Sequence, residues 1–316
     1  MRARAMAACA LMLGACVGPA DVPSNVHDLR VLGESFEPPE LMAPTCDTSS
    51  LANFAVFTSP LQFKALIADP AGQGRPIAWE LWACANPNDR TCTTPTENQL
   101  LASGQTAVTN GLDEELTMTV QPGAVILSNG PADGGPEPLL LQVIQDDPYH
   151  GLGGILMPVV LHLRAGAEEI YAQKLMVFSC QFFPQMKPNQ TPVLRGFQLA
   201  GVEWPNDGGT VRAQGAGSIQ VQADDISDLE ESYVVPGFDL KPVSLVESWK
   251  IDYYTTLGTF SPDETGGTNL DGSADPNTTA WSLPSGATEQ DVNFWFVVRD
   301  GRGGESWTQR KLHYVP

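Results

Sequence analysis

The side chains best suited to chemistry in this 316-residue chain are six cysteines, four of which lie between residues 46 and 180. A thiol can oxidise to a disulfide, bind zinc or take a covalent group. Cys46, Cys84, Cys92 and Cys180 are an even set in a chain that we expect to be exported, and this predicts two disulfides. A zinc site is the weaker interpretation, because the sequence lacks a Cys-x-x-Cys spacing.

Four cysteines allow three pairings, and the spacing favours one of them. Cys84 and Cys92 are separated only by a short polar stretch, residues 85–91, so we expect them to pair. Cys46 and Cys180 would then form a long-range bond that closes the first domain.

Cys16 follows an amino-terminal segment with the layout of a signal peptide. Two arginines lie within the first four residues, residues 5–13 are apolar, and two small residues precede the cysteine. An apolar run of this length is too short to span a bilayer, which needs about 20 residues. The order Leu13-Gly14-Ala15-Cys16 resembles the lipobox of bacterial lipoproteins.

This resemblance implies removal of residues 1–15 and attachment of a diacylglycerol and an N-acyl chain such as palmitate to Cys16. Residues 16–25 would be a lipidated, flexible tether. Val17 follows the cysteine where Asp would resemble an inner-membrane retention signal, so we expect an outer-membrane lipoprotein facing the periplasm or the cell surface. The alternative is an ordinary secretory signal peptide that happens to end near a cysteine.

The chain is strongly acidic, with 37 Asp and Glu against 17 Lys and Arg. Loss of the two signal-peptide arginines would change the formal net charge from −20 to about −22. This charge opposes binding to nucleic acid or to anionic lipid headgroups. It suits solubility and, as a second interpretation, divalent cations.

The pattern of apolar residues predicts an all-β fold of two tandem immunoglobulin-like β-sandwich domains, residues 26–190 and 193–316. The chain is rich in glycine and proline, and short alternating apolar runs recur between turn residues. In the first domain we expect strands near residues 29–36, 61–68, 77–84, 116–120, 139–144, 156–163 and 170–178.

Two tryptophans of the 77–84 strand lie on opposite faces. We expect Trp79 to fill the core of the first sandwich, whereas Trp82 is the better candidate for a sugar-stacking platform. In the second domain, residues 218–223 and 248–253 predict two facing strands. Residues 294–299 and 305–315 predict a hairpin joined by a glycine-rich loop, with a central first strand.

Several short segments carry a resemblance to a lipoprotein family widespread in myxobacteria, in which an immunoglobulin-like domain follows the anchor. These segments are residues 28–32, 37–40, 69–70, 74–76, 79–84 and the link 188–194. The turn Asp300-Gly301-Arg302-Gly303-Gly304, with Trp249 and Gly258-Thr259-Phe260, resembles the polycystic-kidney-disease (PKD) class of repeat. Both resemblances imply fold and location but no activity.

No enzyme motif is present: the chain lacks a Gly-x-Ser-x-Gly elbow, a phosphate-binding loop and a His-Glu-x-x-His zinc motif. The four histidines, His27, His150, His162 and His313, are scattered singly. We therefore predict no catalytic residues and no enzyme, and we expect His162 to be a satisfied residue of a strand.

Two acidic loops are candidates for calcium, which takes six to eight oxygen ligands. One is residues 224–231, and the other contains Asp263, Asp271 and Asp275. A hydrated surface loop is the alternative for each, because the EF-hand spacing is missing.

The sequence thus predicts a membrane-anchored, non-enzymatic structural or binding module of the bacterial cell envelope. The only cofactor expected is the covalent lipid, with calcium as an option. Its partners would be the membrane, through the lipid, and envelope proteins or polysaccharide. The second hypothesis is a calcium-assisted adhesin or carbohydrate-binding surface protein.

Overall fold

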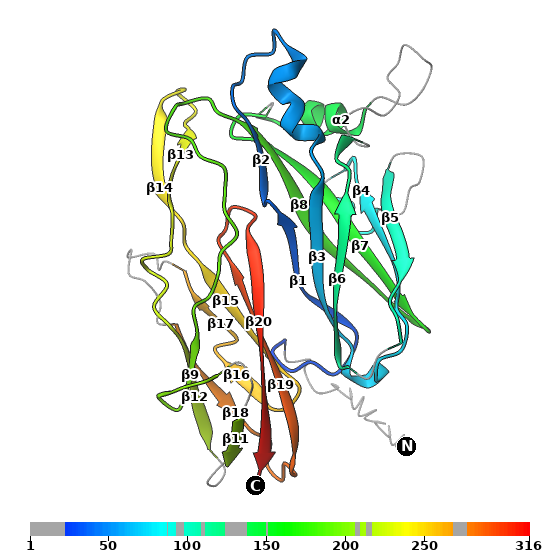
Figure 1. Cartoon of the computed structure of the whole chain (residues 1–316), viewed down its shortest axis with the longest axis vertical. Helices are drawn as coiled ribbons and strands as arrows, with labels where there is room; N and C mark the ends of the chain where they lie inside the picture. Colours follow the sequence, from blue (N-terminus) through cyan, green and yellow to red (C-terminus); the bar gives the residue numbers. More distant parts are fainter. Residues whose placement is uncertain are drawn as a thin grey trace, which may run out of the picture.

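In this computed structural model, residues 23–86, 88–92, 98–108, 111–123, 138–149, 151–205, 209–212, 217–267 and 277–316 are described. Their strands form four sheets and one separate hairpin (Figure 1). No helix in these ranges is long and apolar enough to cross a membrane.

The first sandwich pairs a three-stranded sheet with a five-stranded sheet. The smaller sheet has the order β1-β3-β6, with strands at Arg30–Glu37, Leu61–Ala68 and Asp113–Val120. The larger has the order β2-β8-β7-β4-β5, with strands at Glu40–Ala43, Glu168–Cys180, Ile155–Ala165, Ala78–Ala83 and Gln99–Gln105. Alternation of side chains along each strand sends Phe63 and Ile67 of β3 into the core between the sheets.

The second sandwich is built from two five-stranded sheets. One has the order β11-β20-β19-β15-β17, with strands at Gly209–Arg212, Glu305–Val315, Gln290–Arg299, Lys250–Thr255 and Glu264–Gly266. The other has the order β10-β9-β12-β18-β16, with strands at Val202–Glu203, Phe197–Leu199, Ser218–Ala223, Thr278–Ser282 and Thr259–Ser261. The predicted hairpin is confirmed: β19 is central and pairs with β20 across the loop 300–304.

Strand order makes both sandwiches immunoglobulin-like, as predicted. Immunoglobulin domains pair an A-B-E-D sheet with a C-F-G sheet. In the second sandwich, β9-β12-β18-β16 and β15-β19-β20 give this order with the seven strands in chain sequence. In the first, β1-β3-β6 corresponds to A-B-E, and β4-β7-β8 corresponds to C-F-G. In each sandwich an early strand, β2 or β11, pairs in parallel with the last strand.

One predicted strand is wrong: residues 139–144 belong to a helix, α2 (Leu139–Asp146). Leu139, Leu140 and Val143 are buried on one side of it, which is helical spacing. A short apolar run fits a strand and a buried helix equally well, so periodicity alone could not separate them. Two short 3₁₀ segments lie at Leu51–Thr58 and Pro70–Gly72.

The two sandwiches pack side by side through a third apolar cluster. Leu32, Leu66 and Ala68 lie on the outer face of β1 and β3, where they meet Trp295 and Val297 of β19. Parts of β1 and β3 are therefore buried on both faces, and the four sheets form a stack of four layers (Figure 1). Two indole N–H groups cross the same junction, from Trp295 to Asp113 at 3.0 Å and from Trp307 to Glu115 at 3.2 Å.

A buried charged cluster lies in this junction. Lys174 of the first sandwich contacts a carboxylate oxygen of Glu305 at 2.7 Å, and the backbone N–H of Glu34 donates to the other oxygen at 3.0 Å. Arg299 pairs with both Glu305 and Asp252. Burial, with the charge of Glu305, raises the pKa of Glu34 to about 8. Glu34 is therefore mostly protonated at neutral pH, which leaves two carboxylates for two cations.

Candidate binding surface

The candidate binding surface centres on the hairpin of β13 (Ser232–Pro236) and β14 (Pro242–Val246), which belongs to neither sandwich. It stands at the outer edge of the molecule, with β14 outermost (Figure 1). Five apolar side chains of its turn and of β14 are exposed: Phe238 82%, Leu240 56%, Val243 40%, Leu245 40% and Val246 60%. Because exposure of grouped apolar side chains is unfavourable, such patches mark interaction surfaces.

The turn of the hairpin presents its apolar tip at a conformational cost. Leu240 has φ 58°, in the left-handed region that a leucine rarely occupies. The penalty is on the order of 1–2 kcal/mol. The Leu240 N–H donates to the carbonyl of Gly237 at 2.8 Å, which closes the turn. The Leu240 side chain is 56% exposed, so its burial contributes little to the stability of the fold.

A loop of the first sandwich extends this surface. The ring of Tyr149, 58% exposed, contacts the ring of Phe238 with centroids 5.4 Å apart. Asp147 fixes the loop by accepting the backbone N–H groups of Tyr149 and Gly151, at 3.0 and 2.6 Å. A pocket of about 360 Å³ opens beside Tyr149, lined by Val143, Asp146, Asp147, Pro148, Leu152, Gly153, Gly154, Ile155 and Leu156. The surface is therefore formed by the hairpin together with a loop of the first sandwich.

Arg302, in the loop between β19 and β20, holds the hairpin in place. Its guanidinium lies 4.2 Å from the ring centroid of Tyr233 on β13. It donates to Glu247 at 3.0 Å and lies 3.5 Å from Glu40 of the first sandwich. Glu247, 5% exposed, also accepts the Trp249 indole N–H at 2.9 Å. An isolated two-stranded hairpin is only marginally stable. These contacts stabilise it by joining it to both sandwiches.

Asp300 orders the same loop and ties it to the link between the sandwiches. It accepts the backbone N–H groups of Arg302 and Gly304 at 2.7 and 2.9 Å, and the side-chain amide of Asn189 at 2.7 Å. Burial raises the pKa of Asp300, and the hydrogen bonds act in the opposite direction. Burial, followed by the charge of Glu247, also raises the pKa of Glu231. The glycine-rich turn predicted from the sequence is therefore a structural clamp.

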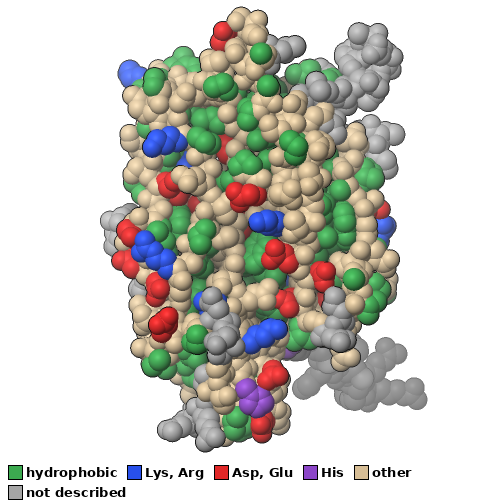
Figure 2. All heavy atoms as spheres, in the orientation of Figure 1, with side chains coloured by type: hydrophobic (Ala, Val, Ile, Leu, Met, Phe, Trp, Pro, Cys, Tyr) green, Lys and Arg blue, Asp and Glu red, His purple; other side chains and the backbone are tan. Residues whose placement is uncertain are grey.

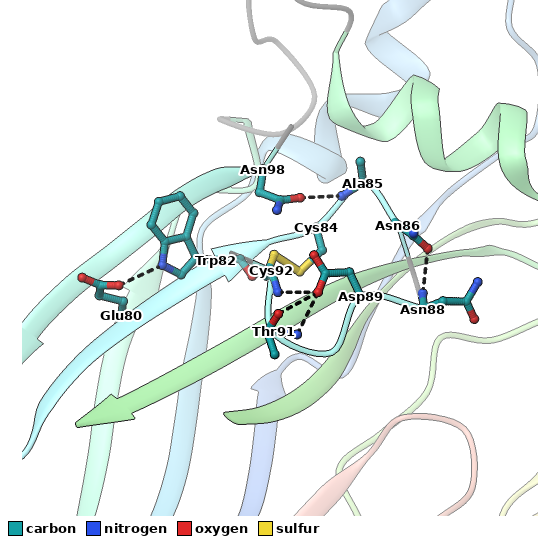
Figure 3. The surroundings of a disulfide bond; sticks show 10 residues. All are labelled: Glu80, Trp82, Cys84, Ala85, Asn86, Asn88, Asp89, Thr91, Cys92 and Asn98. Carbon is teal, nitrogen blue, oxygen red and sulfur yellow. Dashed lines mark hydrogen bonds between the residues drawn. A yellow bond between two sulfur atoms is a disulfide. The ribbon is translucent and has the colours of Figure 1, made fainter. Parts of the chain in front are cut away.

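Both predicted disulfides are present. Cys46 pairs with Cys180, and Cys84 pairs with Cys92. Around the second, Asp89 accepts the backbone N–H groups of Thr91 and Cys92, each at 3.0 Å (Figure 3). The Thr91 N–H contributes most to lowering the pKa of Asp89. The short loop is thus closed by a disulfide and by the Asp89 carboxylate, which accepts hydrogen bonds from two of its backbone N–H groups.

The candidate sugar platform, Trp82, is partly buried beside the Cys84–Cys92 disulfide, and its indole N–H donates to Glu80 at 3.2 Å (Figure 3). Trp79 is only partly buried and packs against the first core rather than filling it, so its predicted role as the central core residue is not confirmed. His162 is 8% exposed, stacks on Tyr171 with centroids 4.3 Å apart and bonds Glu169 at 2.6 Å. It is therefore a satisfied strand residue, as predicted.

Only one of the three predicted calcium ligands lies in the described part of the chain, so the predicted site stays a prediction. Asp263 lies between β16 and β17, and Asp271 and Asp275 fall outside the described residues, as do Cys16 and His150. Among the described residues, no three acidic, histidine or cysteine side chains are grouped as metal ligands. In the other acidic loop, Asp228 pairs with Arg195 at 2.7 Å. On the face in Figure 2, acidic side chains are spread out rather than gathered in one patch.

The exposed hairpin was missed in the sequence analysis, although a signal for it exists. Pro236-Gly237 is a turn dipeptide, and it lies between the apolar runs of residues 233–235 and 243–246. The clamp of Arg302 and Glu247 had no comparable signal, because these residues lie 55 positions apart.

No protein-family model and no curated protein matches this chain. Among solved structures, Escherichia coli alpha-2-macroglobulin activated by porcine elastase aligns at 8% identity and TM-score 0.24, over 93% of this chain but 22% of that protein. The two tandem V-type regions of VCBP3, a v-region-containing chitin binding protein, align at 8% identity and TM-score 0.26, over 90% of this chain and 99% of that one. A Porphyromonas gingivalis W83 protein of unknown function aligns at 10% identity and TM-score 0.18, over 89% and 99%. At these scores the fold rests on the strand order described above.

Proposed function

We propose that this chain is a lipid-anchored, non-enzymatic binding module of the bacterial cell envelope, and that it binds through the β13–β14 hairpin and the Tyr149 loop. The observation that carries the proposal is the exposed apolar surface formed by the hairpin and the Tyr149 loop of the first sandwich. Five hairpin side chains and Tyr149 are each at least 40% exposed. The base of the hairpin is held by the Arg302–Glu247 ion pair, and the Tyr149 loop is held by hydrogen bonds to Asp147. A rigid apolar surface loses little conformational entropy when it binds a partner.

The position of this surface suits a tethered protein. Where the described chain begins, Val26 N–H donates to the carbonyl of Thr255 at 2.9 Å, at one end of β15. The hairpin leads instead into Lys250, at the other end of the same strand. A lipid on Cys16 would therefore hold the molecule by the end away from the hairpin and present the hairpin to a partner.

Replacing the two exposed rings tests this function. The double variant Tyr149→Ser, Phe238→Ser should lose at least about tenfold in affinity for envelope fractions, because each buried aromatic contributes more than about 1 kcal/mol to an interface. Folding should be unaffected, since both rings are exposed. Leu100→Ser, at an exposed leucine on β5, is the matched control. Equal binding by all three proteins in a sedimentation assay would refute the assigned surface.

Anchoring is tested separately at Cys16. Serine cannot form the thioether, so Cys16→Ser should abolish incorporation of labelled fatty acid and leave the protein soluble or uncleaved. Labelling and membrane fractionation measure this directly, with Cys9→Ser as the control inside the predicted signal. Persistent labelling of the Cys16→Ser protein would contradict lipidation at this residue.

A further inference from the structure

The outer edge of the hairpin is an open backbone edge. All five residues of β14 are exposed, whereas four of the five in β13 are half-buried beneath the clamp. In the described chain β14 pairs with β13 alone. Natural proteins usually cover or charge such an edge, because its unpaired N–H and C=O groups accept another strand.

The register determines which backbone groups face outward. Gly237 N–H donates to Lys241 at one end of the hairpin, and Glu247 N–H donates to Glu231 at the other. Hydrogen-bonded pairs recur at every second residue of an antiparallel ladder, so Val243 and Leu245 bond to β13. Ser244 and Val246 therefore direct their N–H and C=O groups away from β13.

The charge of the residues around β14 favours one class of binding partner. Residues 224–247 contain seven acidic residues. Lys241 within this stretch, and Arg195 and Arg302 from outside it, offset part of this charge and leave the region net acidic. A second copy of this chain would bring the same acidic surface and a net charge of −20 to the contact. A basic segment would instead gain from electrostatic attraction.

We propose that β14 accepts an extended basic segment of a partner protein as an added strand, with apolar residues at alternate positions and Lys or Arg between them. This rests on the proposed binding function and names the class of partner. Backbone pairing with Ser244 and Val246 supplies affinity, and the side chains of Val243 and Leu245, which share one face of β14, contact the apolar residues.

The test uses the mature chain and a labelled peptide of alternating valine and lysine, with fluorescence anisotropy as the measurement. A valine–glutamate peptide and a valine–lysine peptide N-methylated along one edge are the matched probes. We expect the lysine peptide to bind at least about tenfold more tightly than either, since each lost backbone hydrogen bond costs about 0.5–1.5 kcal/mol. Equal binding of the lysine and glutamate peptides, or no binding at about 1 mM, overturns the proposal.

Two variants locate the contact. Ser244→Pro removes one outward N–H without removing a bond to β13, and Ser244→Ala keeps it. Proline should weaken lysine-peptide binding about tenfold, and alanine should leave it unchanged. Equal binding by both variants overturns the proposal. If Ser244→Pro does not fold, the N-methylated peptide tests the same bonds on the unaltered chain.

Two outcomes separate this inference from the proposed function. A dimer in analytical ultracentrifugation that Ser244→Pro dissociates, with no peptide bound, assigns the edge to a second copy and overturns a basic partner. The second outcome is a chain that binds no peptide, whose envelope binding survives Ser244→Pro but is lost in the Tyr149→Ser, Phe238→Ser variant. This would overturn the proposal of an added strand at β14 and would still support the proposed binding function.

Discussion

Glu34→Gln should stabilise the protein increasingly as the pH rises. Glu34 is 6% exposed between the sandwiches, and burial raises its pKa from 4.5 to about 8. Between these values the folded chain keeps a proton that the unfolded chain releases, so the free energy of unfolding falls as pH rises. Each pKa unit corresponds to about 1.36 kcal/mol, which makes the total on the order of 5 kcal/mol. Glutamine has no proton to lose and escapes this penalty.

The measurement is the unfolding free energy of both proteins from about pH 4 to pH 9 by chemical denaturation. The difference should be small at the acidic end and reach several kcal/mol above pH 8. Glu305, Lys174 and Arg299 face Glu34 and are present in both proteins, so their own titration largely cancels. Glu203→Gln, at an exposed glutamate, is the control. A difference that does not change with pH would show that Glu34 ionises normally in the folded protein.

Loss of the Cys46–Cys180 disulfide should cost about twice as much stability as loss of Cys84–Cys92. The sequence separations are 134 and 8 residues. Constraint of the unfolded chain then gives about 5 kcal/mol for the first bond and about 2.5 kcal/mol for the second in the chain-entropy model. The first bond also joins the segment after β2 to the end of β8. The link to the second sandwich begins directly after β8.

The double variants Cys46→Ala, Cys180→Ala and Cys84→Ala, Cys92→Ala provide a matched pair, because each removes two sulfurs. Denaturation midpoints of both, beside the oxidised parent, measure the difference. An equal or larger loss from the short loop would mean that strain or residual structure, rather than loop length, sets the contribution of each bond.

The sequence alone predicted the all-β class, the paired sandwiches and both disulfides. Alternation along residues 61–67 and 116–120 defined which face each strand buries, because side chains of a strand alternate between faces. The eight-residue separation of Cys84 and Cys92 limited the pairing, since their backbone atoms cannot move far apart. The helix α2 was predicted as a strand because an eight-residue apolar segment contains too few periods to separate the two.

Only the tertiary structure decided how the sandwiches meet and where the candidate site lies. Trp295 could have faced solvent on a half-exposed sheet, and it is buried because β1 and β3 cover that face. The hairpin is a candidate binding surface because its apolar side chains are exposed. That exposure depends on which parts of the hairpin the rest of the chain covers. Glu34 and Glu305, 271 residues apart, share one buried cluster. Local sequence patterns record the faces of strands and the ends of turns, but contacts across such distances depend on the packing of whole sheets.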